Sequence, residues 1–172
     1  SKYLNEFYGV YNSFSEIHFD KLPNQFVVKA THASSYNLIV KDKSTLNKKK
    51  VRSLFKKWLS TNQYYRTGQE WAYKDVKPRL IAEKYLKEDE RSSLIDYKFY
   101  CFNGKMKILQ IGEIFKGKTR NLYDENLDIL PYKFIDYPID NTYIISKLDI
   151  KKMIKNINKI NKIFEFARID FY

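Results

Sequence analysis

The stretch Asp96-Tyr97-Lys98-Phe99-Tyr100-Cys101-Phe102-Asn103-Gly104-Lys105 decides the fold of this chain. Polar and apolar side chains alternate along it up to Phe102, which is the pattern of a half-buried β-strand. Asn103-Gly104 is a pair that favours a type I′ turn between antiparallel strands. A second β-type run, residues 105–115, follows at once. The sequence therefore predicts a β-hairpin made of strands 95–102 and 105–115.

Further β-type runs lie on both sides of this hairpin, separated by turn residues such as Leu22-Pro23-Asn24. In chain order we expect a short helix or irregular lead-in at 3–20, strands at 26–30 and 37–41 joined by a polar loop at 31–36, a strand at 79–86, short strands and turns at 119–146, and a last strand at 167–172.

Two helices are predicted from apolar side chains at helical spacing. The first is expected to begin at an N-cap Ser44 and the second at Asp149. Their apolar stripes are Val51, Leu54, Phe55, Trp58 and Leu59 in the first, and Ile150, Met153, Ile154, Ile157, Ile160, Ile163 and Phe164 in the second. Runs of strands interrupted by single helices predict an α+β fold, with antiparallel strands and helices on one face.

The length and composition of the chain exclude several classes of protein. The chain has 172 residues, enough for one domain or two small lobes. It has one Cys and two His, so it can form no intrachain disulfide and no cysteine-based zinc site. No apolar run approaches the roughly 20 residues that cross a bilayer, and a reduced, cytoplasmic protein is expected.

The formal charge of +12 favours anionic partners, from nucleotide phosphates to acidic glycans or, loosely, a membrane surface. Only six of the 32 basic residues are Arg, which disfavours sequence-specific base reading. The lysine face of the first predicted helix could bind a nucleic-acid backbone, and the aromatic and basic residues of 64–74 could stack bases. A solvated helix face and an aromatic core explain the same residues.

Gly112–Thr119 matches the spacing of a phosphate-binding P-loop. Ile and Phe occupy its interior, and the residues after it indicate a strand rather than a helix. We therefore interpret the segment as a strand end followed by a lysine-rich turn.

The sequence shows no clear arrangement of residues for nucleophilic catalysis. Cys101 lies within the alternating strand and is expected to be a small buried hydrophobe. A pair between Cys101 and His18 or His32 stays open, although no spacing favours it.

Several basic and acidic residues lie at positions suited to bind a polyphosphate. Lys29 precedes a loop of small polar residues whose N–H groups could close over phosphates. Asp96 and Lys98 share one face of their strand, and so do Arg168 and Asp170, because each pair is spaced by two. An Arg can neutralise phosphoryl oxygens while an Asp binds Mg²⁺.

Taken in order, these segments resemble the TupA-like (teichuronopeptide-biosynthesis-like) ATP-grasp family of bacterial surface-polysaccharide gene clusters. The resemblance is carried by residues 22–29, His32, 37–44, 58–59, 70–73, 78–86, 96–105, 118–124 and 167–172. It implies an α+β, ATP-grasp-like fold, with an N-terminal subdomain at 1–86 and a C-terminal subdomain at 87–172. In the family a further acid lies on the next strand, so the chain is expected to be truncated, with an incomplete metal site and weakened activity.

The resemblance also implies roles for individual residues. Around ATP and Mg²⁺ these are Lys29 on the phosphates; His32, Ser34 and Ser35 in the loop that covers them; Glu83, Lys84, Tyr85 and Leu86 at the adenine hinge; Asp96 near the ribose; and Asp170 as the metal ligand. The catalytic set would be Lys98, Arg120 and Arg168, with Lys118 and Asn121 facing the substrate or the transferring phosphoryl group.

The function implied is an ATP-dependent carboxylate–amine ligase that acts through an acyl phosphate in capsule or cell-surface polysaccharide biosynthesis. Its partners would be a nucleotide, a small-molecule or glycan carboxylate and an amine, with no nucleic acid. Two alternatives stay open: a sugar-nucleotide glycosyltransferase of the same pathway, for which no Asp-x-Asp motif is present, and a non-catalytic basic module that binds nucleic acid or acidic glycans.

Overall fold

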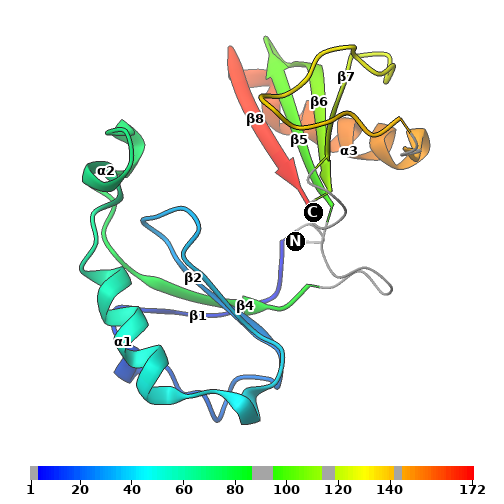
Figure 1. The fold of residues 1–172 in the computed structure, drawn as a ribbon. Helices are drawn as coiled ribbons and strands as arrows, with labels where there is room; N and C mark the ends of the chain where they lie inside the picture. The colour runs from blue at the N-terminus through cyan, green and yellow to red at the C-terminus, as the bar shows by residue number, and fades with distance from the viewer. Residues whose placement is uncertain (1–3, 87–94, 114–118, 142–144) are drawn as a thin grey trace. The chain divides into compact units, whose positions relative to one another are not determined.

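The chain divides into two compact units, Ser1–Leu86 and Lys87–Tyr172, in the computed structural model (Figure 1). The structure describes residues 4–86, 95–113, 119–141 and 145–172. Each unit holds one four-stranded sheet whose neighbouring strands are antiparallel. This arrangement confirms the predicted α+β, ATP-grasp-like fold, with two separate sheets.

The first unit is built on a sheet of order β1-β4-β2-β3. Its strands are β1 (Phe7–Tyr11), β2 (Phe26–Ala30), β3 (Asn37–Val40) and β4 (Leu80–Lys84). Short helical turns connect them: η1 (Phe14–Glu16), η2 (Lys43–Thr45), α2 (Gln63–Arg66) and η3 (Trp71–Tyr73). The longest helix of this unit is α1 (Lys48–Leu59).

The core of the first unit lies between α1 and one face of this sheet. Phe26 and Val28 of β2 are fully buried in one cluster with Phe55 and Trp58 of α1. Because side chains alternate along a strand, Lys29 lies on the opposite face. The core therefore fixes which face of the sheet carries the charged residues.

Two expectations for the first unit were wrong. Residues 7–11 form strand β1 rather than part of a short helix or irregular lead-in, because they pair with β4. The N-cap of α1 is Asn47, whose side chain accepts the Lys50 N–H at 3.0 Å. The predicted cap, Ser44, instead lies in η2, where its own N–H is bound by Asp42.

The second unit has a sheet of order β7-β6-β5-β8. Its strands are β5 (Asp96–Phe102), β6 (Lys105–Glu113), β7 (Thr119–Tyr123) and β8 (Phe166–Phe171). Helix α3 (Lys147–Ile160), followed by η4 (Asn161–Ile163), packs on one face, where Phe99 and Leu109 share a core with Ile150 and Ile157.

The central hairpin of the second unit has the predicted turn. Asn103 and Gly104 both have positive φ, 46° and 76°, as a type I′ turn requires. Cys101 is fully buried beside this turn, which confirms its interpretation as a small core residue. Strand β7 pairs with β6 where a P-loop would need a helix, as the sequence predicted, while residues 114–118 of the matching segment lie outside the described residues.

Helix α3 begins one turn earlier than expected. Its N-cap is Ser146, and Asp149 is the third helical residue, which accepts a hydrogen bond from the Ser146 hydroxyl at 2.7 Å. The predicted apolar stripe is buried at Ile150 and Ile157, but its last three members, Ile160, Ile163 and Phe164, are exposed.

Candidate functional site

The face of the second sheet that points away from α3 carries the predicted phosphate-binding residues. On β5 the residues Phe99 and Cys101 point to the core, so Asp96, Lys98 and Tyr100 lie on the opposite face. We call this the open face of the second sheet. It is the candidate functional site of this unit.

Lys98 lies at the centre of the open face. Its Cα partner on β8 is Asp170, and its partner on β6 is Gln110. The ammonium group also forms an ion pair with Asp96 on its own strand. The Lys98 and Asp96 side chains are only 21% and 26% exposed, so this charge pair is held in a sheltered position.

Arg168 and Asp170 form a two-pronged ion pair on β8. Arg168 Nε donates to Asp170 Oδ1 at 2.9 Å, and Nη2 donates to Oδ2 at 3.1 Å. This hydrogen-bonded carboxylate raises the pKa of Arg168 above its ordinary value. Tyr100 lies opposite Arg168 on β5 and donates its hydroxyl to Gln110 Oε1 at 3.0 Å.

The pKa of Lys98 is lowered, first because burial disfavours its charged form. Arg168 and Arg120 lower it further by repulsion, while Asp170 opposes them by attraction. Arg168 and Arg120 therefore both lie close enough to Lys98 to disfavour its charge. A sheltered cation whose pKa is shifted by burial and by specific charged neighbours is typical of a functional site.

Arg120 extends the open face onto β7. Gly112 is the Cα partner of both Arg120 and Asp96, so these two residues flank a position without a side chain. The guanidinium lies 4.0 Å from the ring centre of Tyr137 and 5.2 Å from that of Phe134. This stacking holds the Arg120 cation in a fixed position at the edge of the open face.

Asn121, which the sequence placed beside Arg120 in the site, points to the other side of the sheet. Its side chain is buried, donates to the Asp140 carbonyl at 2.7 Å and accepts the Asp140 N–H at 2.8 Å. Adjacent residues of a strand face opposite ways, so Arg120 and Asn121 cannot both join the open face. The structure gives Asn121 a packing contact instead.

In the first unit, Lys29 and Glu83 meet on the sheet face opposite α1. Lys29 Nζ lies 3.1 Å from Glu83 Oε2, with the two side chains 29% and 14% exposed. Asn5, which sequence reasoning missed, also donates to Glu83 Oε2 at 3.2 Å. The pairing of β2 with β4 brings these residues together although they are distant in sequence.

In the predicted adenine hinge, residues 83–86, the backbone groups of Lys84 are already hydrogen-bonded within the first unit. The Lys84 N–H donates to the Glu6 carbonyl at 2.9 Å, and the Lys84 carbonyl accepts from Asn5 at 2.8 Å. The Lys84 side chain forms an ion pair with Glu6. Tyr85 and Leu86 follow the strand and are half-buried.

The loop between β2 and β3 is tied to the helices of the first unit. His32 is buried, and its Nε2 lies 2.8 Å from the Trp58 carbonyl oxygen. The exposed Ser34 accepts a hydrogen bond from Gln63 at 3.0 Å. Ser35 is also exposed and has a φ of 65°, in the left-handed region that few residues other than glycine adopt. The structure thus leaves the two serines accessible and places His32 in the interior.

The open face fits the way proteins bind Mg²⁺ with a nucleotide. Across the residues that the structure describes, no three His, Cys, Asp or Glu side chains gather as a metal site. Mg²⁺ is, however, commonly held by one or two carboxylates together with substrate phosphates. Asp170 and Asp96 supply such carboxylates beside three cations. Lys118 lies outside the described residues.

Within the described ranges, no helix has the length and apolar character needed to cross a membrane. The chain has no significant match among curated proteins or solved structures. Residues 2–172 match the family model described as TupA-like ATPgrasp, and membership of an ATP-grasp family indicates an ATP-dependent, ligase-like protein. A match over nearly the whole length, on a fold of two antiparallel sheets, establishes that the chain belongs to the TupA-like ATP-grasp family.

Proposed function

We propose that this chain is an ATP-dependent carboxylate–amine ligase that acts through an acyl phosphate, in the cytoplasm, in bacterial cell-surface polysaccharide biosynthesis. The main support for the proposal is the set of charged side chains on the open face of the second sheet. Three cations, Lys98, Arg120 and Arg168, share it with the carboxylates Asp96 and Asp170. Its formal charge is therefore +1, and it would attract the phosphates of a nucleotide.

The proposed chemistry depends on charge neutralisation. A substrate carboxylate oxygen attacks the γ-phosphorus of ATP, and the bond to the β–γ bridging oxygen breaks to release ADP. Arg168 and Lys98 would hold the β- and γ-phosphates, and Arg120 would face the transferring phosphoryl group. Asp170 would bind Mg²⁺, which neutralises phosphate charge when bound. Because Arg168 donates one hydrogen bond to each Asp170 oxygen, the metal would bind through the carboxylate lone pairs that these hydrogen bonds leave.

The second half of the reaction forms the amide. The amine nitrogen attacks the carbonyl carbon of the acyl phosphate, the carbon–oxygen bond to phosphate breaks, and the nitrogen loses a proton to solvent. Neither half needs a nucleophile from the protein. This agrees with Cys101 being buried, where burial also raises the pKa of its thiol.

In the first unit we assign Lys29 to the ATP phosphates and Glu83 to the adenine amino group. The hinge backbone from Lys84 to Leu86 would contact the base, and the exposed Ser34 and Ser35 would cover the phosphates. Asp96 of the second unit would lie near the ribose, and the role of Lys118 stays a prediction.

Two predicted residues receive other roles. His32 would position the loop through its hydrogen bond to Trp58 rather than touch the nucleotide. Asn121 is left out of the proposed site because the Asp140 backbone occupies its amide.

Phosphate release tests the proposal. We expect release from ATP to require both a uronic acid and a small amine, and to fall to background in Asp170→Asn. Asp128→Asn is the matched control, because Asp128 is exposed and pairs only peripherally with Lys147. Full turnover in Asp170→Asn, or ATP hydrolysis that ignores carboxylate and amine, would contradict the proposal.

A further inference from the structure

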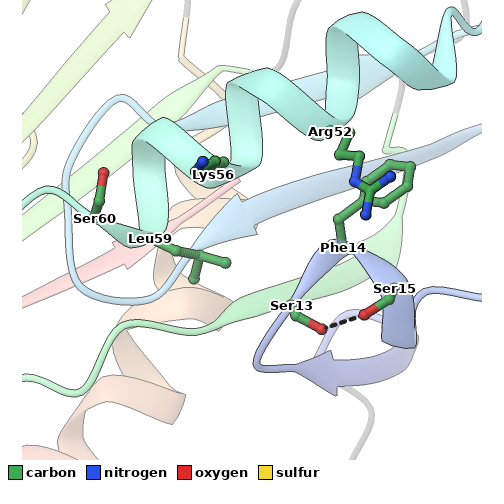
Figure 2. Close-up of a pocket in the computed structure, with 7 residues that line it drawn as sticks. All are labelled: Ser13, Phe14, Ser15, Arg52, Lys56, Leu59 and Ser60. Carbon is green, nitrogen blue, oxygen red and sulfur yellow. Dashed lines mark hydrogen bonds between the residues drawn. The ribbon is translucent and has the colours of Figure 1, made fainter.

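A pocket of about 380 Å³ opens in the first unit between η1 and α1 (Figure 2). Clefts of this size hold small ligands. Its walls are formed by Ser13, Phe14 and Ser15 on one side and by Arg52, Lys56, Leu59 and Ser60 on the other.

This pocket is separate from the residues proposed for ATP. Helix α1 packs on the sheet face that carries Phe26 and Val28, whereas Lys29 and Glu83 lie on the opposite face. None of the proposed nucleotide residues lines the pocket. A ligand bound here therefore serves a purpose other than nucleotide binding by Lys29 and Glu83.

The pocket contains two cations that are not neutralised. Arg52 and Lys56 are one helical turn apart and exposed, and neither forms an ion pair with any carboxylate in the described part of the chain. The acid of η1, Glu16, instead accepts hydrogen bonds from the Asn12 N–H at 2.8 Å and from Ser13 at 3.3 Å. Two adjacent cations that are not paired with a carboxylate are suited to bind an oxyanion.

The rest of the pocket lining combines serine hydroxyls with apolar side chains. The Ser13 and Ser15 hydroxyls lie 2.9 Å apart, and Ser60 donates to the Lys57 carbonyl at 3.0 Å, which leaves hydroxyl lone pairs for a ligand. Figure 2 shows the Arg52 side chain extended over Phe14, and its guanidinium carbon lies 5.9 Å from the ring centre. Phe14 and Leu59 give the apolar contact that suits the C–H groups of a sugar ring.

We propose that this pocket binds a small anionic sugar. Its carboxylate or phosphate group is held by Arg52 and Lys56, and its hydroxyls bond to the serines. A sugar carboxylate and a sugar phosphate both present an oxyanion on a hydroxylated ring. The experiment below distinguishes between these two groups.

The test is a titration of the whole chain, followed by backbone amide NMR shifts, with glucuronate, glucose 6-phosphate and neutral glucose. We expect at least one anionic sugar to shift the amides of residues 13–16 and 52–60, and glucose to shift none at the same concentration. The double variant Arg52→Gln with Lys56→Gln should weaken binding by about tenfold or more. Binding of only one anionic sugar supports the proposal and identifies the oxyanion.

A matched control removes the same charge from the same helix. Lys49 and Lys57 are exposed and lie outside the pocket, so Lys49→Gln with Lys57→Gln should bind within about twofold of the natural chain. Equal weakening in both double variants would overturn the proposal in favour of general attraction of polyanions to α1. Shifts confined to other residues, or no binding of either anionic sugar, would overturn it as well. Magnesium-dependent ATP binding should be unchanged in both variants, so this proposal and the ligase proposal fail separately.

Discussion

Lys98 and Asp170 lie directly opposite each other on the antiparallel strands β5 and β8, although they are far apart in the chain. Arg168, two residues before Asp170, holds the same carboxylate through two hydrogen bonds. Asp170 therefore pairs with Arg168 and lies opposite Lys98 in the strand register, while the Lys98 ammonium group pairs with Asp96. A metal would use the remaining lone pairs of Asp170, and a phosphate the remaining N–H donors of Arg168 and Lys98.

The pH dependence of stability should report the position of Lys98. Burial lowers its pKa below the ordinary value of 10.5, so the folded chain binds fewer protons at this site than the unfolded chain in the interval below pH 10.5. The stability that depends on this group is then greatest above pH 10.5 and is lost as the pH falls through the folded pKa. Relative to Lys98→Met, the natural chain should gain free energy of unfolding as the pH rises.

Urea unfolding between pH 7 and pH 10 measures this gain, which is limited to about 1.4 kcal/mol per pH unit. Lys133→Met is the control, because Lys133 is an exposed lysine in the loop after β7. A stability difference between Lys98→Met and the natural chain that does not change with pH would show that Lys98 is not desolvated.

Asn121→Ala should destabilise the chain without affecting the nucleotide. The substitution leaves the N–H and the carbonyl of Asp140 without their buried partner, at a cost of about 1–3 kcal/mol in the free energy of unfolding. Asn126→Ala, at an exposed turn position, should cost much less. ATP affinity in Asn121→Ala, measured under conditions where the variant is folded, should equal that of the natural chain. A selective loss of affinity would restore Asn121 to the site.

Cys101 should be inert to thiol reagents in the folded chain. Its thiol is fully buried, and burial raises its pKa above 9.0, so neither access nor thiolate is available. Reaction with dithiobis(nitrobenzoate) at pH 8 should follow unfolding in urea. Cys101→Ala combined with Phe102→Cys, which moves the thiol to a side chain 45% exposed, should react at once. Rapid labelling of the natural chain without denaturant would show that the core of the second unit opens readily.

The sequence predicts local features of this fold well because they depend on neighbouring residues. The Asn103-Gly104 turn and the shared faces of Asp96 with Lys98 and of Arg168 with Asp170 follow from turn chemistry and strand alternation. The same alternation could have excluded Asn121 from the face of Arg120. The family resemblance implies site roles for both residues, whereas strand alternation allows only one of them on the open face.

Features that depend on distant contacts could not be predicted in this way. Strand β1 forms because it pairs with β4, and His32 is buried because the Trp58 carbonyl lies within reach. The N-cap of α1 is Asn47 and not the predicted Ser44, because Asp42 binds the Ser44 N–H in a separate turn. In each case a long-range pairing or a competing local hydrogen bond decided between structures that the sequence pattern allowed.

The most direct test of the ligase proposal is calorimetric titration of the chain with a non-hydrolysable ATP analogue, with and without Mg²⁺. We predict that Mg²⁺ tightens binding to the natural chain, that Arg168→Gln weakens binding by about tenfold or more, and that Asp170→Asn abolishes the tightening by Mg²⁺ while Asp128→Asn retains it. Absence of binding, or an undiminished effect of Mg²⁺ in Asp170→Asn, would contradict the assignment of the open face as a magnesium–nucleotide site.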